Sequence, residues 1–279
     1  MSDVAGPLLE ARHVTVRFGG LIAVDDISAS FGAGELVGII GPNGAGKTTF
    51  FNALSGVMVP TAGRLLARGR DLTGARPHRY ARHGIARTFQ TPRVFAEMTL
   101  AENVRFGLRF AGRRRRAETW GPAWLAAWID RVGAPWPWRR RPGVSWLLRN
   151  ELSILNVIGL AHLADMPAAA VTPSQQRLLE IGMALATRPR ILLLDEVAAG
   201  LTESELQDMA QLIRRVRDEL DITVVWIEHA VTTLLRHVER VLVLHQGRMI
   251  ADGTPAEVVR NAEVIEAYLG DEMVEEGVA

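Results

Sequence analysis

Residues 41–48 constrain the fold of this chain more than any other stretch. They read GPNGAGKT, which fits the G-x-x-x-x-G-K-[S/T] pattern of a phosphate-binding loop. The loop follows an apolar run at 35–40 that is typical of a buried strand, and it precedes a helical pattern that stops at Gly56. A strand, a glycine-rich loop and a helix in this order predict an α/β fold with a phosphate site at the loop.

The loop contains the only lysine of the chain, because every other basic side chain among the 32 Lys and Arg residues is arginine. Lys47 is expected to reach the β- and γ-phosphates as a compact ammonium, which a planar guanidinium cannot imitate. The Thr48 hydroxyl is expected to bind Mg²⁺. The candidate nucleotide-binding residues here are Gly41, Pro42, Asn43, Gly44, Ala45, Gly46, Lys47, Thr48 and Thr49.

A second buried strand is predicted at 191–194, and two carboxylates follow it directly. Because acids at the carboxyl end of such a strand face the ligand edge of a parallel sheet, we expect them to meet the phosphate loop. Asp195 is the expected metal ligand, and Glu196 is expected to orient and polarise the attacking water.

The order of several further motifs resembles the ATP-binding cassette (ABC) family over nearly the whole chain. These are RTFQ at 87–90, VTPSQQ at 171–176, ILLLDE at 191–196 and VVWIEHA at 224–230. The resemblance implies one α/β nucleotide-binding domain over 1–279, with a RecA-like core, an N-terminal antiparallel β subdomain and an inserted α-helical subdomain. The expected boundaries are 8–95 and 189–252 for the β subdomain and core, 96–188 for the helical subdomain, and 253–279 for a helical tail.

The same resemblance implies roles for residues outside the loop, with ATP and Mg²⁺ as cofactors. Phe18 would stack on adenine with support from Val24, Gln90 would sense Mg²⁺ and the attacking water, and His229 would touch the γ-phosphate. Taken singly, Phe18 also suits a core ring, Gln90 a polar loop residue and His229 a helix start.

Within the family, phrases such as GIARTFQTPRVFAEMTLAENV and GTPAEVVRNAEVIEAYLGD look most like the larger ATPase subunit of branched-chain amino acid importers, and also like relatives that import urea or amides. This implies a second ATPase subunit in a hetero- or homodimer, two membrane permeases, an indirectly linked periplasmic solute-binding protein, and a peripheral position on the cytoplasmic face of the inner membrane.

No apolar run approaches the roughly 20 residues that cross a bilayer. The net charge of +1 does not favour nucleic acid, and the absence of cysteine excludes disulfides and zinc–thiolate sites.

VTPSQQ departs from the signature motif of the family, which faces the ATP bound by the partner subunit. Thr172 is a good N-cap, Pro173 suits the first helical position, and Gln175 completes a capping box, so a helix is expected. Proline removes one N–H, and Ser174 adds a side chain where glycine would allow close approach. With Thr172, Ser174 and Gln175 left to serve the partner's ATP, we expect a heterodimer with one fast and one slow site. A nucleotide-gated scaffold with little turnover is the alternative.

Two segments carry no assigned chemistry. An insert at 111–149 is rich in tryptophan and arginine, with a stripe at Trp120, Trp124 and Trp128. It is interpreted as packing on the helical subdomain; contact with the permease or inner leaflet and binding of single-stranded nucleic acid are alternatives. Near the end, RVLVLHQGRMIADG predicts a β-hairpin that turns at Gln246 and Gly247.

Overall fold

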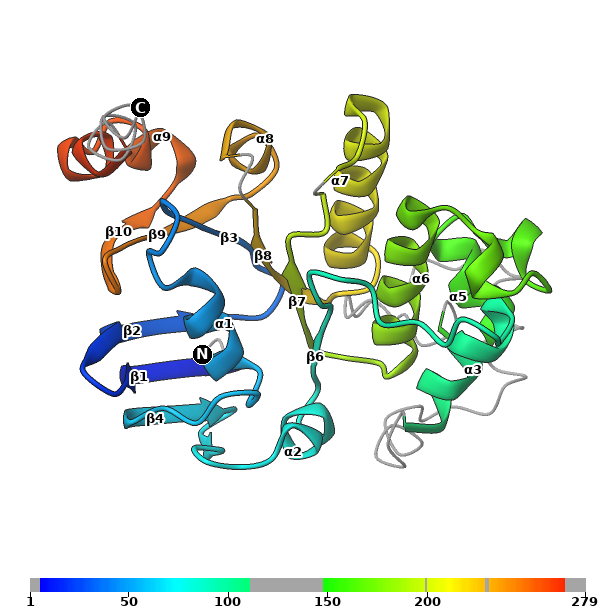
Figure 1. The fold of residues 1–279 in the computed structure, drawn as a ribbon, viewed down its shortest axis with the longest axis horizontal. Helices are drawn as coiled ribbons and strands as arrows, with labels where there is room; N and C mark the ends of the chain where they lie inside the picture. Colours follow the sequence, from blue (N-terminus) through cyan, green and yellow to red (C-terminus); the bar gives the residue numbers. More distant parts are fainter. Residues whose placement is uncertain (1–5, 111–147, 199, 229–230, 269–279) are drawn as a thin grey trace, which may run out of the picture.

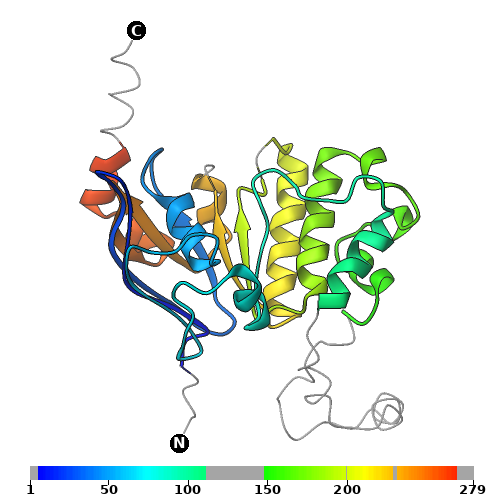
Figure 2. The ribbon, with the colours of Figure 1, turned by 60° about the horizontal axis from the view of Figure 1, so that its bottom comes forward.

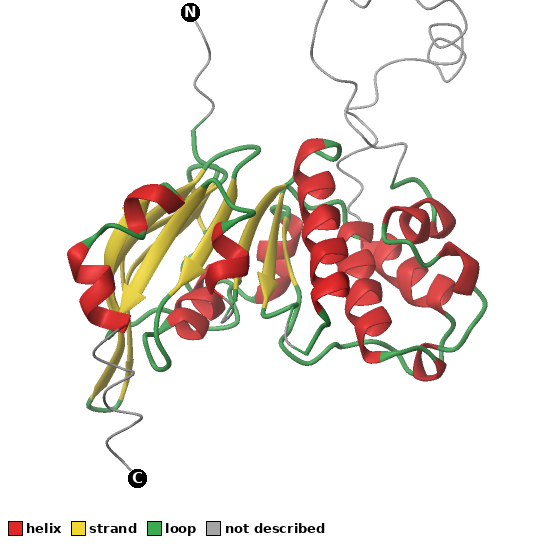
Figure 3. Cartoon of the chain, turned by 90° about the horizontal axis from the view of Figure 1, so that it is seen from above, coloured by secondary structure: helices red, strands yellow, loops and turns green. Residues whose placement is uncertain are grey.

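The structure, a computed structural model, describes residues 6–110, 148–198, 200–228 and 231–268. His229 and the tryptophan stripe lie outside these ranges, so their predicted roles stay predictions. The described part is an α/β fold in which the strands and several helices form one half and helices alone form the other (Figure 3).

A six-stranded sheet runs through the core in the order β10-β9-β3-β8-β7-β6. Its strands are β3 (Leu36–Ile40), β6 (Ile85–Arg87), β7 (Ile191–Asp195), β8 (Thr223–Ile227), β9 (Arg240–His245) and β10 (Arg248–Gly253). All neighbours are parallel except β9 and β10, which form the predicted hairpin. The two strands predicted at 35–40 and 191–194 are therefore confirmed as β3 and β7, and both end at the same edge of the sheet.

The sheet is buried on both faces because its strands carry apolar residues at successive positions. In β3, Leu36 and Ile40 join the core that the sheet shares with the helices, whereas Val37 and Ile39 join the core on the opposite face. Every residue of β3, β7 and β8 is buried. This is the pattern expected of parallel strands covered on both sides.

The opposite face is covered by helix α1 (Lys47–Leu54) and by a second, antiparallel sheet (Figure 1). That sheet has the order β2-β1-β4-β5 and consists of β1 (Leu9–Phe18), β2 (Leu21–Phe31), β4 (Ala62–Ala67) and β5 (Arg70–Asp71). Helix α2 (Pro77–Arg82) then leads to β6. The arrangement matches the antiparallel β subdomain that the family resemblance implies.

The helical half contains α3 (Leu100–Phe110), α5 (Glu151–Val157) and α6 (Pro173–Ala186), with short 3-10 helices at Ala161–Leu163 and Ala168–Ala170 (Figure 2). Helix α7 (Glu203–Asp218) lies between α6 and the sheet (Figure 1). Two shorter helices, α8 (Val231–Leu235) and α9 (Pro255–Val258), follow. Among the described residues, none of these helices has the length and apolar character needed to cross a membrane.

Helix α6 begins as the VTPSQQ stretch predicts. Thr172 is the N-cap, Pro173 is the first helical residue, and the capping box between Thr172 and Gln175 is complete in both directions. Ile181 and Leu185 face the core as expected, while Leu178 is only partly buried. The helix is thus fixed by local hydrogen bonds at its start and by apolar packing along its length.

Candidate active site

The phosphate loop is shaped by two close backbone contacts. Gly41 has φ 152°, and a Cβ there would lie 2.0 Å from the Leu244 carbonyl oxygen. Gly46 has φ 93°, and a Cβ there would lie 2.2 Å from the Ala23 carbonyl oxygen. Glycine is therefore required at both positions by conformation and by space.

Lys47 lies under this loop and is 5% exposed. Its ammonium donates to the carbonyl oxygens of Gly41 at 2.5 Å and Pro42 at 2.8 Å. A buried charge needs such partners, because each lost bond to water must be replaced. The lysine is thereby held at the N-terminus of helix α1. This helix begins without a side-chain cap, so its first backbone N–H groups remain available to an anion.

The β9–β10 hairpin, to which the sequence assigned no chemistry, holds the loop in place. Its turn residues Gln246 and Gly247 both have positive φ, as the hairpin prediction requires. Gly247 N–H donates to the Ala45 carbonyl at 3.0 Å, and Asp25 N–H donates to the Gly247 carbonyl at 2.8 Å. The turn therefore joins the loop to β2 through backbone atoms, which leave no signal in side-chain type.

On the expected adenine side, Phe18 and Val24 differ sharply in exposure. Phe18 ends β1 with half of its surface exposed, whereas Val24 is fully buried in the core. An exposed ring beside a rigid strand suits stacking on a base. Val24 is placed to support the strand, with none of its own surface open to a ligand.

The two acids after β7 are buried beside different partners. Asp195 is 3% exposed and pairs with the Arg87 guanidinium at 2.7 Å. Glu196 is 6% exposed, and its Oε2 accepts from the Gln90 side-chain amide at 2.6 Å. Residues 106 positions apart in sequence, Gln90 and Glu196, are thus brought together as one polar pair.

Glu196 also has an uncommon backbone conformation. Its φ is 48°, in the left-handed region, and its N–H donates to the Ile227 carbonyl at 3.0 Å. A non-glycine residue in this region is strained, and such strain persists where surrounding contacts over-determine it. The carboxylate of this strained residue is the one that Gln90 holds.

Arg87, which ends β6, is a site residue that sequence reasoning missed. Besides Asp195, it donates to the Asn52 side chain at 2.7 Å and the Ser55 hydroxyl at 2.9 Å. Burial lowers the pKa of the Arg87 guanidinium, and the Asp195 carboxylate counteracts this. In a chain whose basic residues are nearly all arginine, only its position at the end of a short strand could have marked it.

Two buried glutamates were missed as well. Glu228 accepts from the Trp226 indole N–H at 2.9 Å and the Ala198 N–H at 2.7 Å, and burial raises the pKa of its carboxyl group. Glu180 on α6 accepts backbone N–H groups on either side of Gln90, from Phe89 and Arg93. Single acids in apolar stretches give no periodic signal, so neither contact was predictable.

The start of α6 is tied to the elements that carry the acids. Arg177 donates to the carbonyl oxygens of Glu196 at 3.2 Å and Val197 at 3.0 Å. The Ser174 hydroxyl lies 3.0 Å from that of Thr172, within hydrogen-bond distance. The Thr202 backbone N–H lowers the pKa of the Glu205 carboxyl group, and the hydroxyls of Ser174 and Thr202 lower it further. The Ser174 hydroxyl is therefore engaged within the chain.

The donor set fits a hard cation. The hydroxyl of Thr48, the carboxylate of Asp195 and the amide oxygen of Gln90 are all oxygen ligands of the kind that Mg²⁺ prefers. No cluster of three or more His, Asp or Glu side chains able to hold a metal occurs among the described residues. A cation here would thus complete its coordination with water and ligand phosphates.

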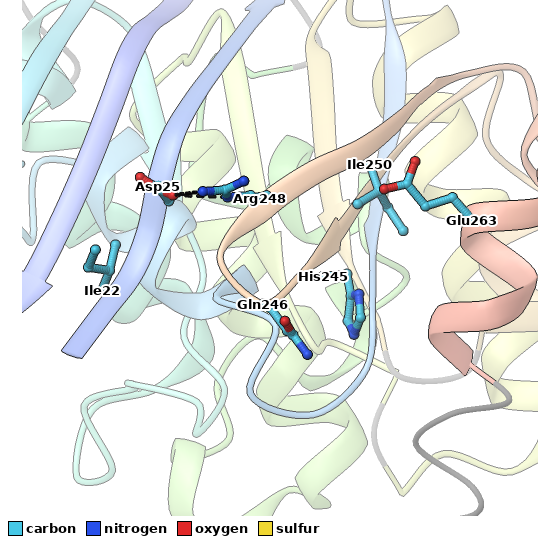
Figure 4. Close-up of a pocket in the computed structure, with 7 residues that line it drawn as sticks. All are labelled: Ile22, Asp25, His245, Gln246, Arg248, Ile250 and Glu263. Atoms are coloured by element: carbon cyan, nitrogen blue, oxygen red, sulfur yellow. Dashed lines mark hydrogen bonds and ion pairs between the residues drawn. The ribbon is translucent and has the colours of Figure 1, made fainter.

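A separate pocket lies between β2, the hairpin and the helical segment that carries Glu263 (Figure 4). The ion pair of Arg248 and Asp25, at 2.8 Å, spans one side of it. The pocket is lined by Ile22, Asp25, His245, Gln246, Arg248, Ile250 and Glu263. None of the site residues predicted from the sequence lines it.

Comparison with known families gives two matches. Residues 24–199 match the model described as ABC transporter, and residues 248–274 match the model described as branched-chain amino acid ATP-binding cassette transporter. The first match covers more than half of the chain and includes the phosphate loop, Gln90, Asp195 and Glu196.

Curated relatives align over nearly their whole length. The chain is 37% identical to the high-affinity branched-chain amino acid transport ATP-binding protein BraF of Pseudomonas aeruginosa, with 95% of this chain and 98% of the relative covered. It is 36% identical to the corresponding protein LivG of Escherichia coli, with the same coverage.

Solved structures show the same fold. A nucleotide-free ATP-binding cassette of an ABC transporter superposes with a TM-score of 0.73 at 28% identity, covering 94% of this chain and 98% of that one. An ATP-binding cassette in its ADP conformation gives 0.73 at 28% identity, covering 95% and 99%.

Proposed function

The chain belongs to the ATP-binding cassette transporter family, and we propose that it is the ATPase subunit that energises an importer of branched-chain amino acids. ATP binding and hydrolysis are the activity of this family. The substrate class is supported by relatives whose names specify branched-chain amino acid transport and by the matching C-terminal segment 248–274. Importers of urea or amides are the alternative within the family.

The contact between Gln90 and Glu196 carries the proposal for hydrolysis. A carboxylate that polarises water must be held in one orientation close to the phosphate site. Here the Gln90 amide fixes one Glu196 oxygen at 2.6 Å, at the sheet edge to which β3 also delivers the phosphate loop. The Glu196 carboxylate is the proposed acceptor for a proton of the attacking water.

The remaining residues divide the work of binding. We assign the phosphates to Lys47 and the loop N–H groups, adenine to Phe18, and the γ-phosphate in part to His229. Mg²⁺, held by Thr48, Asp195 and Gln90, would supply charge stabilisation to the phosphates. Arg87 holds the Asp195 carboxylate at 2.7 Å, which keeps this ligand oriented toward the site.

The altered start of α6 supports an asymmetric pair of sites. In the proposed dimer this helix faces the ATP of a second ATPase subunit, and Pro173 removes one donor from it. The Ser174 hydroxyl lies within hydrogen-bond distance of the Thr172 hydroxyl and also interacts with Glu205, so both groups would compete with a phosphate for it. The site completed by this chain would therefore be slow, and the site that uses Glu196 would carry the turnover.

The proposed assembly has this subunit and a second ATPase subunit bound to two permeases, which receive solute from a periplasmic binding protein. The chain would then be peripheral, on the cytoplasmic face of the membrane.

The altered α6 start also favours a second candidate, a nucleotide-gated scaffold that binds ATP and scarcely turns it over. Glu196, with its bonded and strained placement, favours hydrolysis.

Replacing Glu196 with Gln in the reconstituted transporter tests this proposal. Turnover of ATP and uptake of labelled leucine are expected to fall by roughly a hundredfold or more, because the proton acceptor is lost. The exposed change Glu266→Gln serves as the control. Undiminished turnover would contradict a dominant site at Glu196. Wild-type uptake of labelled urea with no uptake of leucine would reassign the solute.

A further inference from the structure

The segment that carries Gln90 is fastened at both ends. We define the Gln90 segment as residues 88–99, between β6 and α3. At its start, Thr88 N–H continues the ladder to the Leu193 carbonyl at 2.9 Å, and its hydroxyl accepts from Asp195 N–H at 3.1 Å. At its end, the buried Asn103 side chain accepts from Phe95 N–H at 2.8 Å. The exposed Gln90 lies between these anchors.

Glu180 holds the middle of this segment. It is 6% exposed on the buried face of α6, and one carboxylate oxygen accepts from Phe89 N–H at 3.3 Å while the other accepts from Arg93 N–H at 3.0 Å. The two bonds flank Gln90 in sequence. A single side chain of α6 thus connects this helix to the backbone on both sides of Gln90, the residue that contacts Glu196.

Glu180 is buried beside two arginines and the Phe89 ring. Two guanidinium groups lie over the Phe89 ring, that of Arg93 at 4.3 Å and that of Arg87 at 4.8 Å from its centroid. Both arginines interact favourably with the carboxylate, yet burial raises the pKa of Glu180 to about 7. A buried carboxylate at this cost is retained for its hydrogen bonds rather than for apolar packing.

We infer that Glu180 is a positioning residue that couples the start of α6, and through it the partner's ATP, to Gln90 and the hydrolysis of this chain's own ATP. The inference rests on the proposed function for its link to turnover. The physical link is short: α6 carries Glu180, Glu180 holds the two N–H groups beside Gln90, and Gln90 holds Glu196. A shift of α6 would therefore be transmitted to Gln90 and to its contact with Glu196.

Glu180→Gln isolates the hydrogen-bond role from packing. Glutamine has the same size and shape, but it offers one acceptor oxygen and presents an NH₂ group to the second backbone N–H. Glu180→Ala removes both acceptors and leaves a cavity. If Glu180 only filled space, Gln would behave as wild type and Ala would be defective.

The first measurement is amide hydrogen exchange on the full-length chain. In Glu180→Gln, exchange at Phe89 and Arg93 is expected to accelerate by roughly tenfold, since about one net hydrogen bond of stabilisation is lost from each opening. Exchange at Thr88 is expected to stay unchanged. In the intact wild type, the amide proton shifts of Phe89 and Arg93 should follow the titration of the Glu180 carboxyl, which requires no variant to fold.

The second measurement is ATP turnover of the assembled transporter. Glu180→Gln is expected to lower kcat roughly tenfold and to leave KM for ATP within about twofold, because Lys47 and the loop are untouched. Glu266→Gln is the control. Wild-type exchange and kcat in Glu180→Gln, or amide shifts that ignore the titration, would overturn the inference. A wild-type complex without turnover would refute the proposed function. The hydrogen-exchange measurement would still decide whether Glu180 holds the Phe89 and Arg93 N–H groups.

Discussion

The phosphate loop and the Gln90 segment both follow parallel strands at the same edge of one sheet, but different forces hold them. The loop is fixed by backbone atoms that approach so closely that Gly41 and Gly46 have no room for a Cβ. The Gln90 segment is fixed by side chains, chiefly Glu180 and Asn103, that accept its backbone N–H groups. The loop therefore tolerates no added atom at Gly41 or Gly46, whereas the Gln90 segment depends on the acceptor oxygens that bind its N–H groups.

Adding one methyl group to the loop should give the largest effect. In Gly46→Ala the new Cβ would overlap the Ala23 carbonyl. We therefore expect ATP binding to be lost and the free energy of unfolding to fall by more than about 4 kcal/mol. Gly44→Ala is the matched control, because it also has positive φ but no atom within 4 Å, and about 1 kcal/mol is expected. Urea unfolding and nucleotide titration measure both; equal losses would refute the steric account.

Removing the buried cation beside Asp195 should have the next largest effect. Arg87→Leu leaves the buried Asp195 carboxylate without its guanidinium partner, which should lower the free energy of unfolding by about 3 kcal/mol. Arg87→Lys keeps the charge but not the fork that reaches Asn52 and Ser55, so an intermediate loss is expected. Urea denaturation of the three proteins decides this, and a leucine variant as stable as wild type would show that the pair contributes nothing net.

The smallest effect is a pH dependence carried by Glu180. Its pKa is about 7 in the folded chain against 4.5 as the ordinary value, so the folded state binds more protons between these two values. Stability from this group is therefore complete below the ordinary pKa and is lost as the pH rises through 7, by about 2 kcal/mol from about pH 5 to about pH 7.

Glu180→Gln removes this titration, so its unfolding free energy should lack that part of the slope. Chemical denaturation at several pH values measures the difference between variant and wild type. Parallel curves would show that Glu180 does not carry the proton. The ionised form that best holds the Gln90 segment is thus the form that the fold stabilises least.

The same contrast explains what the sequence could predict. The phosphate loop, β3, β7 and the capped start of α6 follow from glycine positions, apolar runs and capping residues, which act locally and leave a pattern. The site residues proposed from the family resemblance also come from short motifs. The structure brings Gln90 and Glu196 together, and their roles in hydrolysis stay predictions. What was missed depends on single side chains that meet across the fold: Arg87, Glu180 and Glu228.

The left-handed backbone at Glu196 has a consequence for the history of such a chain. Glycine at this position would relieve the strain and make the fold more stable, and it would also delete the carboxylate proposed to activate water. Selection for stability alone would therefore lead away from hydrolysis at this residue. A descendant that no longer needed turnover would be expected to drift toward glycine or asparagine here, so the residue at position 196 would record whether a given lineage still uses its ATP.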